Sequence, residues 1–156
     1  MIIVSDASPL IALAQADTLA TLEALFGRLL IPESIRVEIV DQCRIDDQRR
    51  RILAALSEFI DVANPEGMAR FTRNLGVGEQ GALQLAPERG ADLVLMDDRK
   101  ARNEAARHSL ACAFTTDLLR LAEQRQIISS CTAVIDALRA HRIYLPGVPP
   151  AASATH

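Results

Sequence analysis

The stretch ADLVLMDDRKAR, residues 91–102, holds the clearest structural signal in the chain. Residues 91–96 form a short apolar run, which predicts a strand that is buried on both of its faces. Asp97 and Asp98 follow at once, and a helical segment begins at Arg99. A buried strand that passes directly into a helix is typical of a βα unit in a parallel sheet.

Strands and helices alternate along the rest of the chain as well. Apolar runs predict further strands at residues 1–5, 29–31, 59–63 and 111–114. Helical spacing of apolar residues, together with capping residues, predicts helices at residues 9–16, 18–27, 33–41, 46–57, 78–86, 99–108, 117–126 and 130–141. This alternation predicts an α/β fold with a mainly parallel sheet and helices on both of its faces.

The expected domain occupies residues 1–145, since a chain of 156 residues suits a single domain. Residues 64–77 hold few periodic apolar residues, so we expect the main loop there. After Tyr144 the sequence turns to Pro, Ala, Ser and Gly, which predicts a flexible C-terminal tail at residues 146–156.

The composition excludes several classes of protein. A net charge of −3 excludes a globally basic nucleic-acid binder, and aromatic residues at 3% argue against exposed rings that hold bases. The three cysteines form no CxxC pair, so neither a zinc site nor a disulfide framework is expected. The chain has no apolar run of membrane-spanning length and does not begin with a signal-peptide pattern, which favours a cytoplasmic protein.

Acidic residues lie at the joints between the expected strands and helices. Five of them are candidate site residues, namely Asp6, Glu38, Glu79, Asp97 and Asp98. The carboxyl ends of parallel strands meet at one edge of a sheet, so we expect Asp6 to approach the Asp97–Asp98 pair. Crowded carboxylates repel one another and lose hydration, and a divalent cation would compensate for both effects.

Each acid also has an ordinary structural explanation. Asp6 can form a turn with its own backbone, and Glu38 can be a solvated helix residue. One aspartate is enough to cap the helix that follows Met96, but two adjacent ones exceed that need. Glu79 favours a site role more strongly, because it heads the apolar face of its own helix, where an unpaired carboxylate is costly.

Four short motifs, in this order, resemble the PIN domain. They are DASPLIALA, IPESIRVEI, GEQGAL and DDRKAR, and the resemblance covers residues 1–128. The closest resemblance is to the small prokaryotic branch that is related to VapC toxins. It implies a three-layer fold, and hydrolysis of RNA with Mg²⁺, or Mn²⁺ as a substitute, held by three or four acids.

Carried over residue by residue, the resemblance implies a catalytic set and a metal-binding set. The catalytic set is Asp6, Glu38, Glu79, Asp97 and Asp98. The metal ligands are Asp6, Glu79, Asp97 and Asp98, with a preference for Asp98 within the pair, and Glu38 acts as an outer ligand or orients water. Four residues beside the acids are candidates for substrate binding: Ser8, Arg99, Lys100 and Arg102.

The sequence departs from the branch at two places. Gly81 stands where a better helix former is usual, and Pro87 interrupts the same helix. Thr115, Thr116 and Asp117 replace a glycine-containing turn, and we interpret Asp117 as a helix cap.

The resemblance also implies partners. These are an RNA substrate, a small antitoxin protein of a VapBC-type system and a second copy of the chain in a homodimer.

A catalytically weak PIN-like module that acts through protein or nucleic-acid binding is the alternative. An aspartyl-phosphate site of the receiver type also places acids at strand ends, but it expects its acidic pair near the first strand.

Overall fold

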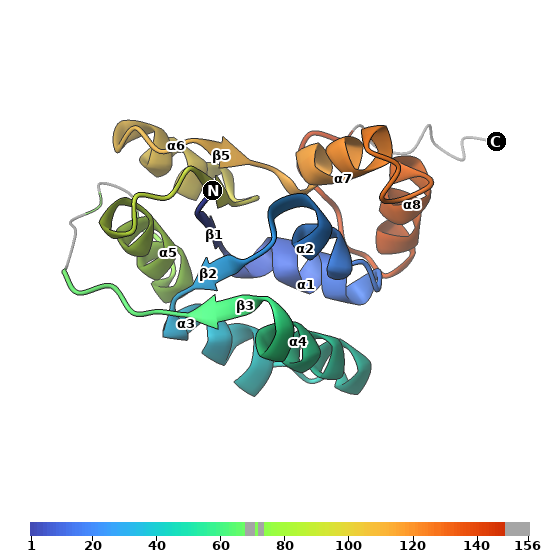
Figure 1. Ribbon diagram of the computed structural model, residues 1–156, viewed down its shortest axis with the longest axis horizontal. Helices are drawn as coiled ribbons and strands as arrows, with labels where there is room; N and C mark the ends of the chain where they lie inside the picture. Colours follow the sequence, from blue (N-terminus) through green and yellow to red (C-terminus); the bar gives the residue numbers. More distant parts are fainter. Residues whose placement is uncertain (68–70, 72–73, 149–156) are drawn as a thin grey trace.

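Five short strands form one parallel sheet in the order β3-β2-β1-β4-β5 (Figure 1). The computed structural model describes residues 1–67, 71 and 74–148. The strands are β1 (Ile3–Ser5), β2 (Leu29–Ile31), β3 (Ile60–Val62), β4 (Leu93–Leu95) and β5 (Cys112–Ala113). All five lie within the predicted strands, and the predicted α/β fold with a parallel sheet is confirmed.

The helices follow the predicted order. They are α1 (Ala7–Gln15), α2 (Ala20–Phe26), α3 (Glu33–Arg36), α4 (Asp46–Glu58), α5 (Val77–Glu88), α6 (Arg99–Arg107), α7 (Thr115–Gln124) and α8 (Cys131–Ala140). The predicted helix at residues 33–41 changes pitch, because α3 continues as the π-helical segment η1 (Val37–Asp41). Pro87 lies one residue before the end of α5 and so marks its last turn. In the described part of the chain, no helix is long and apolar enough to cross a membrane.

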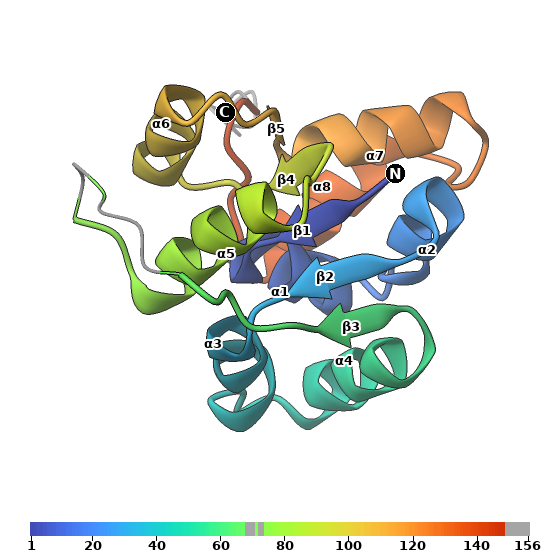
Figure 2. The same ribbon diagram turned by 60° about the vertical axis from the view of Figure 1, so that its left-hand side comes forward.

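Helices cover both faces of the sheet, which gives the three layers (Figure 2). On one face, Ile3 and Leu95 pack with residues of α1, α2, α4, α7 and α8. On the other face, Val4 and Val94 pack with residues of α5 and α6. Successive strand residues point to opposite faces, so the central strands β1 and β4 each contribute to both cores.

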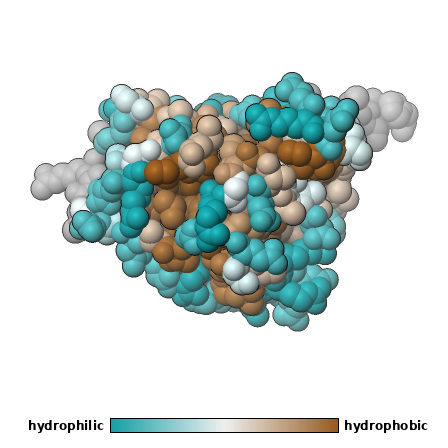
Figure 3. Space-filling model, viewed as in Figure 1, coloured by the Kyte–Doolittle hydropathy of each residue, from teal (hydrophilic) through white to brown (hydrophobic). Residues whose placement is uncertain are grey.

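The surface mixes hydrophilic and apolar side chains. On the face shown in Figure 3, apolar side chains gather over the central elements, and hydrophilic side chains surround them. More than half of a folded protein's surface is ordinarily apolar, so this distribution alone does not mark a site.

The C-terminal segment stays packed on the domain for as far as it is described. Leu145 is only 8% exposed, and Val148 packs against the core that contains α7 and α8. The Thr116 hydroxyl donates a hydrogen bond of 3.4 Å to the carbonyl of Pro146. The segment therefore forms a wall of the domain at positions where the sequence predicted the start of a tail. Residues 149–156 of the predicted tail lie outside the described residues.

Candidate functional site

Asp6 and Asp97 meet at the carboxyl edge of the sheet, as the strand order requires. The strands β1 and β4 are neighbours, with Ser5 opposite Leu95. The Asp6 backbone N–H extends this pairing by donating to the Leu95 carbonyl at 2.9 Å. Asp6 is 3% exposed and Asp97 is 9% exposed, so the edge holds two buried carboxylates.

The charged groups around Asp6 are acidic. Burial raises the pKa of Asp6 from 3.8 to about 7, and a hydrogen bond from the Ala7 backbone N–H opposes this effect only in part. The negative charges of Glu79, Glu38 and Asp97 raise the pKa further. Acids from three other segments of the chain therefore act on one carboxyl group.

Glu38 and Glu79 approach each other because helix α5 packs closely against α3. A Cβ atom at Gly81 would lie 2.7 Å from Ser34 Oγ and 3.1 Å from Pro32 Cγ. The helix can therefore come this close only with glycine at residue 81, which explains a departure from the family pattern. A Cβ atom at Gly78 would lie 2.7 Å from Ile35 Cδ1 and 3.2 Å from Glu38 Oε2, so the second glycine leaves room for both side chains.

Burial also raises the pKa of Glu38 and of Glu79. For Glu79, a hydrogen bond of 3.1 Å from the Gly76 backbone N–H and the charge of Lys100 lower the pKa, whereas the charges of Asp98 and Glu38 raise it. Lys100, one of the predicted substrate-binding residues, thus lies close enough to act on an acid of the site.

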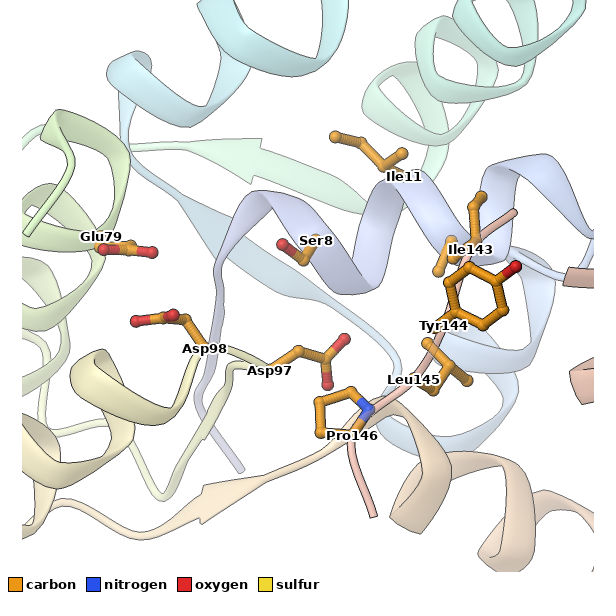
Figure 4. A pocket seen from close by; sticks show the side chains of 10 residues that line it. Ser8, Ile11, Glu79, Asp97, Asp98, Ile143, Tyr144, Leu145 and Pro146 are labelled. Carbon is orange, nitrogen blue, oxygen red and sulfur yellow. The ribbon is translucent and has the colours of Figure 1, made fainter. Parts of the chain in front are cut away.

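The adjacent residues Asp97 and Asp98 face different surroundings. Asp97 accepts two hydrogen bonds from Thr115, at 2.8 Å from the backbone N–H and at 2.7 Å from the hydroxyl. Asp98 caps helix α6 by accepting a hydrogen bond of 2.9 Å from the Ala101 N–H. In Figure 4 the Asp98 carboxylate lies toward Glu79, whereas the Asp97 carboxylate points toward Pro146. Asp97 therefore ties β4 to the start of α7, and Asp98 faces Glu79.

Local donors hold three of the acids in their present orientations, namely Glu79, Asp97 and Asp98. Across residues 1–67, 71 and 74–148, no three Asp, Glu, His or Cys side chains are arranged to hold one metal ion. The donor set nevertheless fits Mg²⁺, which prefers oxygen ligands and one or two carboxylates. Several of these acids already act on one another electrostatically.

The remaining predicted substrate-binding residues take different positions. Ser8 is exposed and lines a pocket beside the acids. Burial raises the pKa of Asp97, and the charge of Arg102, whose guanidinium lies 3.4 Å above the centre of the Phe114 ring, opposes this rise in part. Arg99 opens α6 and is exposed. Arg102 thus supports the fold around Asp97, whereas Ser8 borders the pocket itself.

A pocket of about 400 Å³ lies at this acidic edge and is lined by three of the acids, Glu79, Asp97 and Asp98 (Figure 4). Its lining residues are Ser8, Ile11, Ala12, Glu79, Asp97, Asp98, Ile143, Tyr144, Leu145 and Pro146. A second pocket of about 430 Å³ lies beside Glu38 and is lined by Val77 and Gln42 among others. The sequence did not predict that Thr115 binds Asp97 or that the C-terminal segment lines the first pocket. Both features depend on contacts with distant parts of the chain.

The fold and these acids agree with one known family. A protein-family model described as PIN domain matches residues 2–148. A solved structure of a PilT N-terminus domain protein from the hyperthermophilic archaeon Sulfolobus solfataricus is similar to this chain. Its TM-score is 0.53 and its sequence identity 18%, with 78% of this chain and 93% of that chain covered. No curated protein matches the sequence significantly.

The chain belongs to the PIN-domain family. The predicted membership of the PIN-domain family and the predicted three-layer fold are confirmed. PIN domains are generally nucleases and generally use divalent metal ions.

Proposed function

We propose that the chain is a Mg²⁺-dependent endoribonuclease and the toxin of a VapBC-type toxin–antitoxin pair. The observation that supports the proposal is the electrostatic environment of Asp6. This carboxyl is buried, its pKa is raised to about 7, and the charges of Glu79, Glu38 and Asp97 all act against its ionisation. Such a cluster costs folding free energy, and binding of a divalent cation would offset that cost.

Asp6, Glu79 and Asp98 are the proposed metal ligands, with Mn²⁺ as a possible substitute for Mg²⁺. The bound ion would make a water more acidic and would stabilise charge on the phosphate. Glu38, close to Glu79, would act as an outer ligand or orient the attacking water. Asp97, fixed by Thr115, holds the end of β4 in place so that Asp98 faces Glu79. Asp97 is therefore a positioning residue in this proposal.

The proposed substrate is single-stranded or loop RNA, because an enzyme must splay the backbone to reach one phosphodiester. Lys100 and Arg99 would contact neighbouring phosphates. The proposed partners are a small antitoxin protein and a second copy of the chain, and the proposed location is the cytoplasm. These assignments rest on the resemblance to VapC toxins.

The test is cleavage of unstructured and structured RNA by purified protein with Mg²⁺ or Mn²⁺. We expect Asp6→Asn and Asp98→Asn to lower the cleavage rate by more than the roughly 10- to 100-fold typical of residues that only orient metal ligands. Asn also caps helices well, so Asp98→Asn should keep the stability of the wild type. Asp61→Asn, far along the sheet on β3, is the matched control and should cleave normally.

Two results would contradict the proposal. One is the absence of metal-dependent cleavage by the wild type, and the other is full cleavage by Asp6→Asn. Intact binding of a protein partner without any cleavage would favour the alternative, a PIN-like module that acts by binding. Growth arrest on expression, relieved by Asp98→Asn, would support the toxin role, and harmless expression at high level would count against it.

A further inference from the structure

The pocket at the acidic edge has two chemically different ends. Glu79 and Asp98 lie at one end, whereas Ile143, Tyr144 and Leu145 lie at the other (Figure 4). A nucleotide has the same division, with a charged phosphate and a flat, largely apolar base. The volume of about 400 Å³ lies within the range of roughly 300 to 1,000 Å³ that is usual for ligand pockets.

Tyr144 combines an exposed ring with a fixed backbone. Tyr144 is 72% exposed, whereas the next residue, Leu145, is only 8% exposed. The following carbonyl, of Pro146, accepts the hydrogen bond from Thr116. The segment therefore presents the ring from an anchored position, which keeps the entropic cost of a stacking contact low.

We propose that Tyr144 stacks against a nucleobase of the RNA whose phosphate lies at the acidic end of the pocket. This inference rests on the proposed function, and it adds a subsite for the base. A tyrosine ring tolerates any base, because every base has a flat face to stack on. The low aromatic content argues against stacking surfaces in general, but a single ring beside the acids meets the requirement of one subsite.

The chain offers a direct probe of this contact, because Tyr144 is its only tyrosine and it has no tryptophan. Intrinsic tyrosine fluorescence of the full chain therefore reports on this ring alone. Binding is measured with Ca²⁺ in place of Mg²⁺, using a short single-stranded RNA and an abasic oligonucleotide of the same length. The abasic strand retains the phosphates and lacks the bases.

We expect the RNA to quench the tyrosine emission and the abasic strand to leave it nearly unchanged. Tyr144→Ala should weaken RNA binding roughly 5- to 150-fold, the range for loss of one stacked base, without weakening binding of the abasic strand. Tyr144→Phe keeps the ring and should bind RNA like the wild type, as measured by fluorescence anisotropy of labelled strands.

Unchanged tyrosine emission at saturating RNA would overturn the proposal. So would equal loss of RNA and abasic binding in Tyr144→Ala, since that result would indicate a general structural defect. Base-dependent quenching without any Mg²⁺-dependent cleavage would retain the base subsite and refute the nuclease, so the two failures can be told apart.

Discussion

Acidic residues at the carboxyl edge of the sheet and those on the rim of the molecule have opposite surroundings. On the rim, Asp61 pairs with Arg28 at 2.6 Å, and Arg36 pairs with Glu33 at 2.5 Å. These hydrogen bonds and charges lower the pKa of both acids. At the edge, burial and neighbouring carboxylates raise the pKa of Asp6 and of Glu79.

The difference separates acids that fit the folded chain from acids that oppose its folding. An acid with a lowered pKa favours the folded state at neutral pH, whereas an acid with a raised pKa disfavours it. A chain gains nothing in stability by gathering carboxylates in a partly buried pocket. The edge therefore has the properties of a functional site, where stability is given up for binding or catalysis.

The largest effect that tests this comparison is expected for Asp6→Asn in metal-free protein. The pKa of Asp6 is about 7 in the folded chain and 3.8 without the fold. The folded state therefore retains a proton that the unfolded state loses as pH rises from about 4 to about 7, and stability falls across this window. The full cost is on the order of 4 kcal/mol, from about 1.4 kcal/mol for each pKa unit.

We therefore expect Asp6→Asn to match the wild type near pH 4 and to be several kcal/mol more stable near pH 8. Urea denaturation in EDTA across this pH range measures the difference. A difference that does not change with pH would break the comparison, because it would show that Asp6 ionises as easily in the folded chain as in the unfolded one. Mg²⁺ should stabilise the wild type and not the variant, by about 2.7 kcal/mol at a hundredfold excess over its Kd.

The order of strands and helices could be predicted from local patterns. The run at residues 91–96 contains β4, and the cap at Asp98 begins α6 as expected. The convergence of Asp6 with Asp97 also followed, because parallel neighbours share an edge. Such features depend on periodicity and capping within a few residues, which a single sequence displays directly.

Side-chain orientation and close packing could not be predicted in the same way. Asp97 turns toward Thr115, which comes from a segment 18 residues later, so the roles of Asp97 and Asp98 separate only in three dimensions. Gly81 looked like a weak helix residue, but its place is set by Pro32 and Ser34 on another element. Tyr144 stood next to a predicted tail because nothing local indicated that Leu145 is buried.

A smaller effect is expected at Asp97, an acid of the carboxyl edge that accepts hydrogen bonds from Thr115. Thr115→Val removes the hydroxyl that donates to the Asp97 carboxylate at 2.7 Å, while the backbone hydrogen bond remains. Loss of a hydrogen bond to a buried charged group should lower the free energy of unfolding at pH 7 by roughly 1 to 3 kcal/mol.

Thr116→Val is the matched control, because the neighbouring hydroxyl is also buried but donates to the neutral carbonyl of Pro146 at 3.4 Å. Thr116→Val should lower the free energy of unfolding by less than Thr115→Val does. Thr115→Ser, which keeps the hydroxyl, should retain most of the wild-type stability. Equal losses for both valine variants would show that the Asp97 contact adds nothing beyond ordinary packing.

The smallest effect is expected for Asp61→Asn on the rim. Its difference in stability from the wild type changes with pH in the opposite direction to that of Asp6→Asn. The side-chain hydrogen bonds and charge of Arg28 lower the pKa of Asp61, so the stabilisation is present above the unfolded pKa of Asp61 and is lost as pH falls through the folded one. Both side chains are largely exposed, so solvent and salt screen the pair. We expect Asp61→Asn to be slightly less stable than the wild type at pH 7 and equal to it at pH 3. Denaturation curves measured in parallel with those of Asp6→Asn would then diverge in opposite directions as pH rises, and divergence in the same direction would remove the distinction between edge and rim.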